Sequence, residues 1–170
     1  YMVSLLSILP FTAPACGLAQ GGGEAPEAPK VYFVRDITPE NMVRLYEALE
    51  RPATGKVAVK LSTGEPGGHN FLKPELIKDL VQKVDDTIVE CNTDYGGGRA
   101  STENHLKAAA DHGFTAIAPV DIMDAEGEVS LPVKGGRHLR ENFVGSHYPA
   151  YDFTVVLSHF KGHAMGGFGG

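Results

Sequence analysis

The residues with the clearest chemical potential lie in the last stretch of the sequence, SHFKGHAMGGFGG (158–170). His159 and His163 are four residues apart, so a helix would place both imidazoles on one face. An extended chain would instead place His159, Lys161 and His163 on one face. Because both conformations bring these groups together, we predict that the three residues are catalytic, with imidazole acid–base groups beside an ammonium group. The alternative is that they cap a strand end and bond to backbone carbonyl groups.

The same two imidazoles could bind a divalent metal ion. Imidazole nitrogen is a common metal ligand, and a carboxylate would extend the ligand set. The candidate carboxylates elsewhere in the sequence are Glu65, Asp94 and Asp121. His159 and His163 are therefore predicted both as catalytic groups and as metal ligands.

Polar, glycine-rich segments follow the predicted strands. Two of them are STGEPGGHN (62–70) and ECNTDYGGGR (90–99). In an open parallel sheet the ligand site lies outside the carboxyl ends of the strands, where loops and helix N-termini converge. The glycine run before Arg99 lets the backbone approach a ligand and suits an oxyanion or a phosphate group. The side chains that we predict to bind a ligand are Glu65, His69, Asn70, Asn92, Asp94 and Arg99.

The elements that must position these groups alternate between strand and helix patterns. Short apolar runs predict strands at 31–34, 57–61, 87–89, 115–120 and 153–157, with a hairpin or edge pair at 129–133 and 139–144. Capping residues and apolar spacing predict a helix that starts at Pro39 and helices at 74–84 and 101–112. This order predicts an α/β fold with a mostly parallel open sheet and helices on both faces, in a three-layer, Rossmann-like arrangement.

Length and charge restrict the class of protein. A chain of 170 residues corresponds to about one domain. The sequence has 15 Lys and Arg against 21 Asp and Glu, a net charge of −6, and no cluster of Lys or Arg offers the basic footprint that nucleic acid requires. We therefore expect no nucleic-acid partner.

The first 19 residues are typical of an export signal. They carry no charge, and the apolar run Val3–Phe11 is too short to span a bilayer. Small residues before Cys16 resemble a bacterial lipoprotein cleavage box, so lipidation of Cys16 and a membrane tether are an alternative to an ordinary signal peptide. We predict a signal peptide or lipoprotein signal at 1–19, a flexible linker at 20–29 and a single α/β domain at 30–170. The expected location is the bacterial periplasm or cell envelope.

Three segments carry a resemblance to a known family: VKLSTGEPGGHNFLKPE (59–75), ECNTDYGGGRASTENHLKAAADHGF (90–114) and VVLSHFKGHAMGGFGG (155–170). From Val57 to Gly170 the sequence resembles the bacterial and archaeal family catalogued as domain of unknown function 362. Members of that family are usually described as iron–sulphur centre proteins, and many carry or adjoin ferredoxin-like cysteine clusters. The resemblance implies a redox role with a redox partner, although no specific reaction follows from membership.

The cysteine content departs from that implication. A [4Fe–4S] cluster ordinarily needs about four Cys thiolates, and the sequence has two cysteines, Cys16 and Cys91. Because family members typically continue beyond the GFGG motif, we expect the domain to be truncated after Gly170 and any cluster to lie in a missing or separate module. The alternative function is a metal- or anion-dependent enzyme that acts on a small acidic substrate without a cluster. A third option is a surface-tethered binding domain with no catalytic activity.

Overall fold

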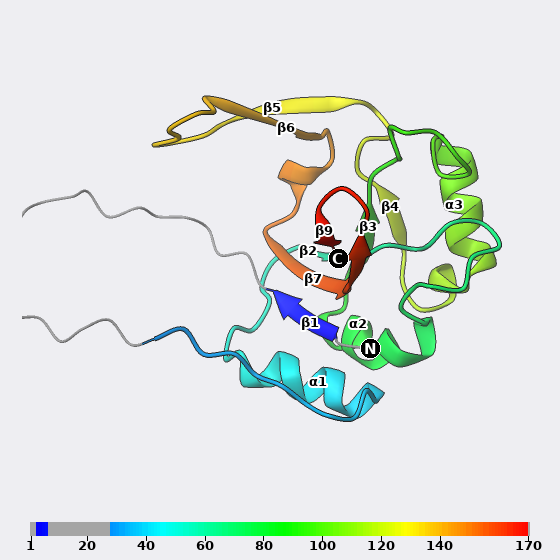
Figure 1. Ribbon diagram of the computed structural model, residues 1–170, viewed down its shortest axis with the longest axis vertical. Coiled ribbons are helices and arrows are strands. Elements are labelled where there is room, and N and C mark those ends of the chain that lie inside the picture. The colour runs from blue at the N-terminus through cyan, green and yellow to red at the C-terminus, as the bar shows by residue number, and fades with distance from the viewer. Residues whose placement is uncertain (1–2, 7–27, 170) are drawn as a thin grey trace, which may run out of the picture.

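Helices and strands alternate along the chain in the computed structural model, which describes residues 3–6 and 28–169 (Figure 1). In chain order the elements are β1 (Val3–Leu6), α1 (Pro39–Ala48), β2 (Val57–Lys60), α2 (Pro74–Val84), β3 (Thr87–Glu90), α3 (Thr102–Asp111), η1 (Phe114–Ala116), β4 (Val120–Ile122), β5 (Glu128–Pro132), β6 (Glu141–Gly145), η2 (Tyr148–Ala150), β7 (Phe153–His159), β8 (Lys161–His163) and β9 (Gly167–Gly169). The two η elements are 3-10 helices. This order confirms the predicted α/β class.

Five strands form the central sheet, in the order β1-β7-β2-β3-β4. Strands β7, β2, β3 and β4 run parallel, and β1 joins the outer edge of β7 in the antiparallel direction. Val59 of β2 lies opposite Ile88 of β3 and Val155 of β7. Because the parallel strands all end at the same edge, the loops that follow them converge there. The predicted mostly parallel open sheet is confirmed.

The first two helices begin where the sequence supplies a start signal. The Thr38 hydroxyl accepts a hydrogen bond from the Asn41 backbone N–H (3.2 Å), and Pro39 occupies the first turn of α1. Pro74 likewise occupies the first turn of α2, whose N-cap residue Lys73 makes no side-chain capping bond, and this helix ends at Asp85 in the left-handed conformation (φ 52°). Both helices therefore begin at the predicted residues.

One face of the sheet carries the main hydrophobic core. Val59, Ile88 and Val155 belong to a buried cluster that also contains Ile77 of α2 and Ala109 of α3. Side chains of α1 join the same cluster, so within the described residues the helices cover this one face of the sheet. The arrangement thus differs from the predicted three layers, which place helices on both faces.

The side chains on the opposite face of the sheet explain why the helices of the described residues pack on one face alone. Successive side chains of a strand alternate between faces, so β2 presents Ala58 and Lys60 on this side, where they offer little apolar area to a helix. Ala58 forms a small buried cluster with Val89 and Met123, and Tyr151 packs against it. The antiparallel hairpin β5–β6 projects from the molecule on the side away from α1 and α2 (Figure 1).

Two of the predicted strands do not form over their predicted ranges. Residues 31–34 have no regular structure, and Val31 and Phe33 are 91% and 69% exposed. In Figure 1 the segment before α1 runs alongside that helix and not beside an edge strand of the sheet, so it has no strand to pair with there. The predicted strand at 115–120 is mostly the 3-10 turn η1 and the residues after it, because the buried Phe114 packs into the core at the start of that turn. Strand β4 begins only at the last residue of that range.

The predicted signal segment (1–19) and linker (20–29) lie largely outside the described residues, and so does Cys16. Of the first 19 residues the structure describes 3–6, which form β1. No helix within the described residues has the length and apolar character needed to cross a membrane.

Replacing Phe114 with Ala tests the position of the core. Phe114 is fully buried, so the substitution removes packing on every side, and we expect the free energy of unfolding to fall by about 3–5 kcal/mol. Urea denaturation measures the change. Leu106→Ala, at a partly exposed position of α3, serves as the control and should cost less than about 1 kcal/mol. Equal losses in the two variants would contradict the described core.

Candidate functional site

The carboxyl edge of the sheet contains a cavity of about 660 Å³. Its wall combines the ends of β2, β3 and β7 with the loops that follow them and with β8. The predicted site residues that line it are Glu65, Asn70, Arg99, His159, Lys161 and His163. The structure therefore brings together side chains from all three segments that the sequence singles out. Their chemical roles remain predictions.

Three predicted ligand-binding residues lie outside this wall. His69 and Asp94 are exposed and do not line the cavity. Asn92 is engaged within the protein: its amide nitrogen donates to the Thr102 hydroxyl (3.0 Å), and its amide oxygen lies 3.3 Å from Nδ1 of His105. Asn92 thus links the end of β3 to α3.

Arg99 is the centre of an ion-pair network. Its Nε and Nη2 donate to Oε1 of Glu65 at 3.0 and 2.7 Å, and its Nη1 donates to Oε1 of Glu90. Burial disfavours the charged guanidinium, but the hydrogen bond to Glu65 and the charges of Glu90 and Glu65 raise the pKa of Arg99. Because its charge is already paired with two carboxylates of this chain, Arg99 holds the loops together in this structure.

Glu90 is buried, yet it is held in the ionised form. Its Oε2 accepts hydrogen bonds from the backbone N–H and the hydroxyl of Thr63, at 2.9 and 2.7 Å, and lies 3.0 Å from Nε2 of His105. Burial by itself raises the pKa of Glu90, but the bonds from His105 and Thr63 and the charge of Arg99 lower it to about 2. Every oxygen of this carboxylate therefore has a partner.

Close contact between two loops depends on Gly98. A Cβ atom at this position would lie 2.5 Å from Cγ of Pro66, which is far inside van der Waals contact. The loop after β3 can approach the loop after β2 only because residue 98 has no side chain. The next residue in sequence is Arg99, so this approach carries the guanidinium to Glu65.

The C-terminal segment is extended, as one of the two predicted alternatives requires. Strand β7 ends at His159, and β8 carries Lys161 and His163. Strands β8 and β9 pair in an antiparallel hairpin, in whose turn Nδ1 of His163 accepts hydrogen bonds from the backbone N–H groups of Met165 (3.2 Å) and Gly166 (3.0 Å). A neutral imidazole whose Nδ1 accepts carries its proton on Nε2, which is then a donor.

This tautomer bears on the predicted metal site. A nitrogen that carries a proton is not a metal ligand, so in this tautomer Nε2 of His163 is a hydrogen-bond donor. Within residues 3–6 and 28–169, no group of three or more His, Cys, Asp or Glu is placed to hold a metal ion. Of the three candidate carboxylates, Glu65 lines the cavity. The metal role of His159 and His163 stays a prediction.

One cationic residue in the wall was missed by the sequence analysis. Lys60 is the last residue of β2, lines the cavity, and donates from Nζ to the backbone carbonyl of Leu61 (3.0 Å). Lys60, Arg99 and Lys161 outnumber the two carboxylates of the wall, so the lining has an excess of one positive charge. The available signal was a lysine at the carboxyl end of the apolar strand VAVK.

The donor atoms of the described residues do not fit a [4Fe–4S] cluster. Cys91 is the one cysteine among them. A cluster ligand is a thiolate, whereas burial and the nearby carboxylate of Asp124 raise the pKa of the Cys91 thiol. The surroundings of Cys91 therefore favour the neutral thiol, whereas a cluster ligand is a thiolate.

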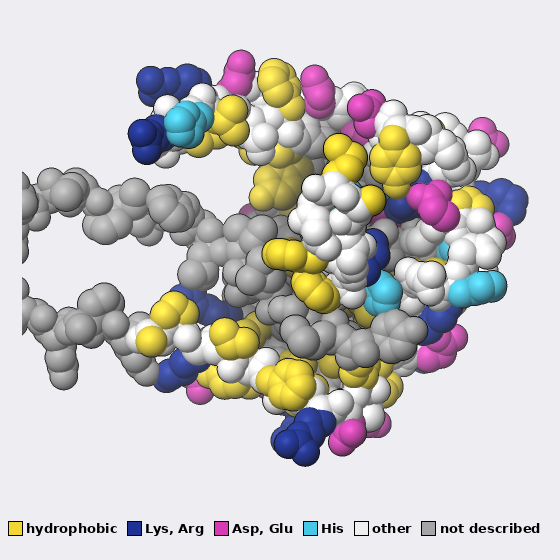
Figure 2. Space-filling view, viewed as in Figure 1, with side chains coloured by type: hydrophobic (Ala, Val, Ile, Leu, Met, Phe, Trp, Pro, Cys, Tyr) yellow, Lys and Arg dark blue, Asp and Glu magenta, His cyan; other side chains and the backbone are white. Residues whose placement is uncertain are grey.

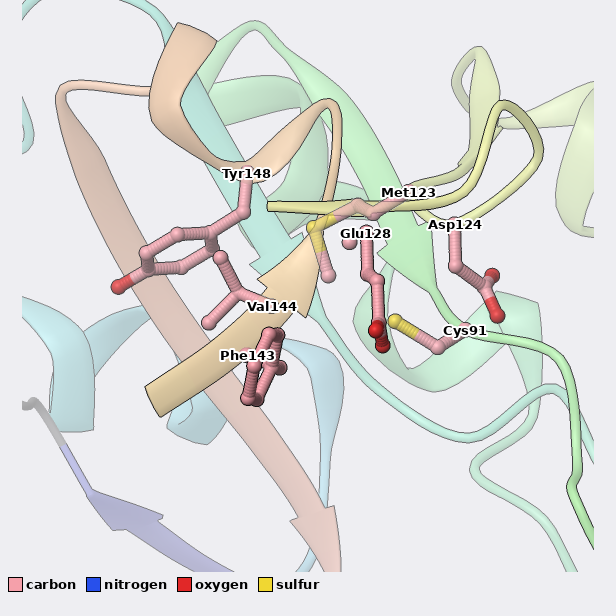
Figure 3. A pocket seen from close by; sticks show the side chains of 8 residues that line it. Cys91, Met123, Asp124, Glu128, Phe143, Val144 and Tyr148 are labelled. Carbon is pink, nitrogen blue, oxygen red and sulfur yellow. The ribbon is translucent and has the colours of Figure 1, made fainter. Parts of the chain in front are cut away.

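Cys91 lies beside a second cavity, of about 350 Å³ (Figure 3). The base of the β5–β6 hairpin and the residues after β4 form most of its wall. Its other lining residues are Met123, Asp124, Glu128, Phe143, Val144, Gly145 and Tyr148. Figure 3 shows the Cys91 thiol among these side chains, with Met123 and Asp124 also labelled. Apolar and acidic neighbours both favour the neutral thiol.

Asp121 lies outside the main cavity and already has partners. Its two oxygens accept hydrogen bonds from Nδ1 of His147 (2.8 Å) and from the Tyr151 hydroxyl (2.7 Å). Burial and the bond to Asp121 raise the pKa of Tyr151 above its ordinary value, and the bond to Asp121 raises the pKa of His147. This group joins β4 to the segment around η2.

Together these features define an α/β domain with a polar cavity at the carboxyl ends of parallel strands. Residues 57–170, about two thirds of the chain, match the family model described as "Domain of unknown function (DUF362)". The chain therefore belongs to this family, as the sequence resemblance predicts. No curated protein and no solved structure matches the chain.

The buried Glu90 predicts a specific pH dependence of stability. Its folded-state pKa of about 2 lies below the ordinary value of 4.5, so its contribution is fully present above pH 4.5 and is lost as the pH falls toward 2. We expect Glu90→Gln to lower the free energy of unfolding at neutral pH by about 3 kcal/mol and to flatten its decline in acid. Urea titrations between neutral pH and about pH 2.5 measure both effects.

Asp79→Asn is the matched control for Glu90→Gln, because it also converts a carboxylate to an amide but on the exposed side of α2. It should leave the acid decline almost unchanged. If the profiles of Glu90→Gln and the unsubstituted protein run parallel across this pH range, Glu90 is not held ionised by its neighbours.

The Cys91 thiol is predicted to be unreactive. In a Cys16→Ser background it is the sole thiol, and its raised pKa should make alkylation by iodoacetamide at pH 8 slower than that of a free cysteine peptide. Asp124→Asn should accelerate the reaction, because it removes a nearby negative charge. Mass spectrometry follows the rate, and alkylation in urea supplies the unfolded reference. If Cys91 in the folded protein is alkylated as fast as the free cysteine peptide, its surroundings do not raise the pKa of the thiol.

Proposed function

We propose that this domain binds a small acidic molecule in the cavity at the carboxyl edge of its sheet. Lys60 and Lys161 would face the negative charge of the ligand, and Nε2 of His163 would donate a hydrogen bond to it. The observation that carries the proposal is the charge of the cavity wall. Its two carboxylates are paired with Arg99, while two lysines and two histidines line the same space.

The size and remaining lining of the cavity support a small ligand. Its volume of about 660 Å³ lies within the usual range of small-molecule sites, roughly 300–1,000 Å³. Ser62 and Ser158 supply hydroxyl groups, and Val156 and Leu157 supply apolar surface. A short carbon skeleton with one or two carboxylate or phosphate groups matches this combination.

If the bound molecule reacts, the groups in the wall suit acid–base chemistry. His159 ends β7 and lines the cavity, so it is our candidate for proton transfer to or from the ligand. Lys161, two residues further on, would stabilise negative charge that develops on the ligand. What supports this assignment is that the imidazole and ammonium groups line one cavity.

Anion binding can be tested with inorganic phosphate and citrate as probes. A ligand at ten times its Kd stabilises the folded state by about 1.4 kcal/mol, so the thermal midpoint should rise by roughly 3–5 °C. Lys60→Met and Lys161→Met should each reduce this rise, because each removes one positive charge from the wall. Circular dichroism follows the midpoint, with sodium chloride at the same ionic strength as the reference.

Lys78→Met is the control variant, since Lys78 is an exposed lysine of α2 outside the cavity wall. It should keep the full response to both probes. The proposal fails if neither anion raises the midpoint more than sodium chloride does. It also fails if both cavity variants respond as fully as Lys78→Met, because the anions would then act on the general surface.

A further inference from the structure

The tip of the β5–β6 hairpin, residues 133–140, is a positively charged projection on an acidic protein. It carries the exposed side chains of Lys134, Arg137 and Arg140, with the exposed His138 between them. Figure 2 shows Lys, Arg and His side chains gathered at the free end of this hairpin. These residues are separate from both cavities.

The charge of the tip contrasts with that of the rest of the chain. No acidic residue occurs between Glu128 and Glu141, and the latter accepts a hydrogen bond from Ser130 (2.6 Å) at the base of the tip. Three of the 15 Lys and Arg residues are on the tip, so the other twelve share the remaining sequence with all 21 acidic residues. Within the described residues, the three tip cations form no ion pair. Their charge is therefore available to an external partner.

The tip is closely folded. The Val133 N–H donates to the Arg140 carbonyl (2.8 Å), which closes the loop. A Cβ atom at Gly136 would lie 2.2 Å from the carbonyl oxygen of Leu139, so the backbone there is packed as tightly as glycine permits. This fold leaves Leu139 61% exposed between the cationic side chains. The tip thus displays an exposed apolar side chain together with three exposed cationic ones.

We propose that the hairpin tip docks on an anionic membrane surface. Lipid phosphate groups would meet Lys134, Arg137 and Arg140, and Leu139 would enter the boundary between headgroups and acyl chains. Each cation near such a surface contributes modestly and is screened by salt, so the contact is weak, reversible and sensitive to ionic strength. This inference does not depend on the proposed ligand site.

Shape and composition favour a lipid surface over other anionic partners. The tip projects from the molecule, so it suits a broad, deformable surface (Figure 1). Nucleic acid offers no apolar layer for Leu139, and the acidic remainder of the chain would oppose a longer contact with it. The acidic remainder of the chain would also be repelled by an anionic membrane, so the hairpin tip would be the part that makes contact.

Co-sedimentation with vesicles tests the proposal on the full chain. Vesicles of equal parts phosphatidylglycerol and phosphatidylcholine should bind the protein at low salt, and pure phosphatidylcholine vesicles should bind it weakly. Arg137→Glu/Arg140→Glu should weaken the first interaction by more than about tenfold. Leu139→Ser should weaken it several-fold without any change in charge. All variants share residues 1–27, so any contribution of that segment is common to them.

The double variant Arg51→Glu/Lys78→Glu is the control, because it changes the net charge equally at exposed positions outside the hairpin. It should bind like the unsubstituted protein, and circular dichroism should show that every variant is folded. The proposal is overturned if the unsubstituted protein does not bind the anionic vesicles or if the two double variants lose binding equally. Retention on polyglutamate resin without vesicle binding would also overturn it, and would indicate an acidic protein partner.

Discussion

The buried ion pair of Arg99 and Glu90 is the interaction on which the site depends. An isolated charge in such a position would cost several kcal/mol, so each side chain requires the other. The pair is extended by Glu65 from the loop after β2 and by His105 from α3. Two loops and a helix are thereby fixed relative to the end of β3. The cavity keeps its shape because these polar groups must remain together.

The alternation of side chains along the strands divides the sheet into two faces with different roles. Val57 and Val59 of β2 face the helices and belong to the main core, whereas Ala58 and Lys60 face the other way. The core face supplies stability through apolar burial. The second face leaves room for the β5–β6 hairpin and places the Lys60 ammonium group at the edge of the cavity.

Local chemistry was sufficient to predict much of the fold. The helix start at Pro39 follows from capping and proline geometry, and the start at Pro74 follows from proline geometry alone. The meeting of the polar loops follows from parallel strands that end at one edge. Residues 31–34 show the limit, because β propensity cannot say whether a neighbouring strand exists. The helices on one face show the same limit, since an apolar strand does not reveal which side is covered.

The meeting of the polar loops was predictable, whereas the interactions made by their side chains were not. A sequence in which Arg99 follows three glycines indicates an anion site, but its observed partners are two carboxylates of the same chain. The pair with Glu65 joins two loops that are distant in sequence, so no spacing rule could reveal it. Lys60 was overlooked because a lysine that ends an apolar strand resembles an ordinary solvent-facing residue.

The part of the cavity wall that lies on the C-terminal hairpin β8–β9 is expected to be less stable than the part formed by the central sheet. Lys161 and His163 both lie on β8, which is held to β9 by three residue pairs and is exposed along its length. Such a small unit can open while the sheet remains folded, since local opening needs far less free energy than global unfolding. Ligand affinity would then scale with the fraction of molecules in which the hairpin is closed. Under the proposed function, folding of the sheet and closure of the binding cavity would therefore be two separate equilibria.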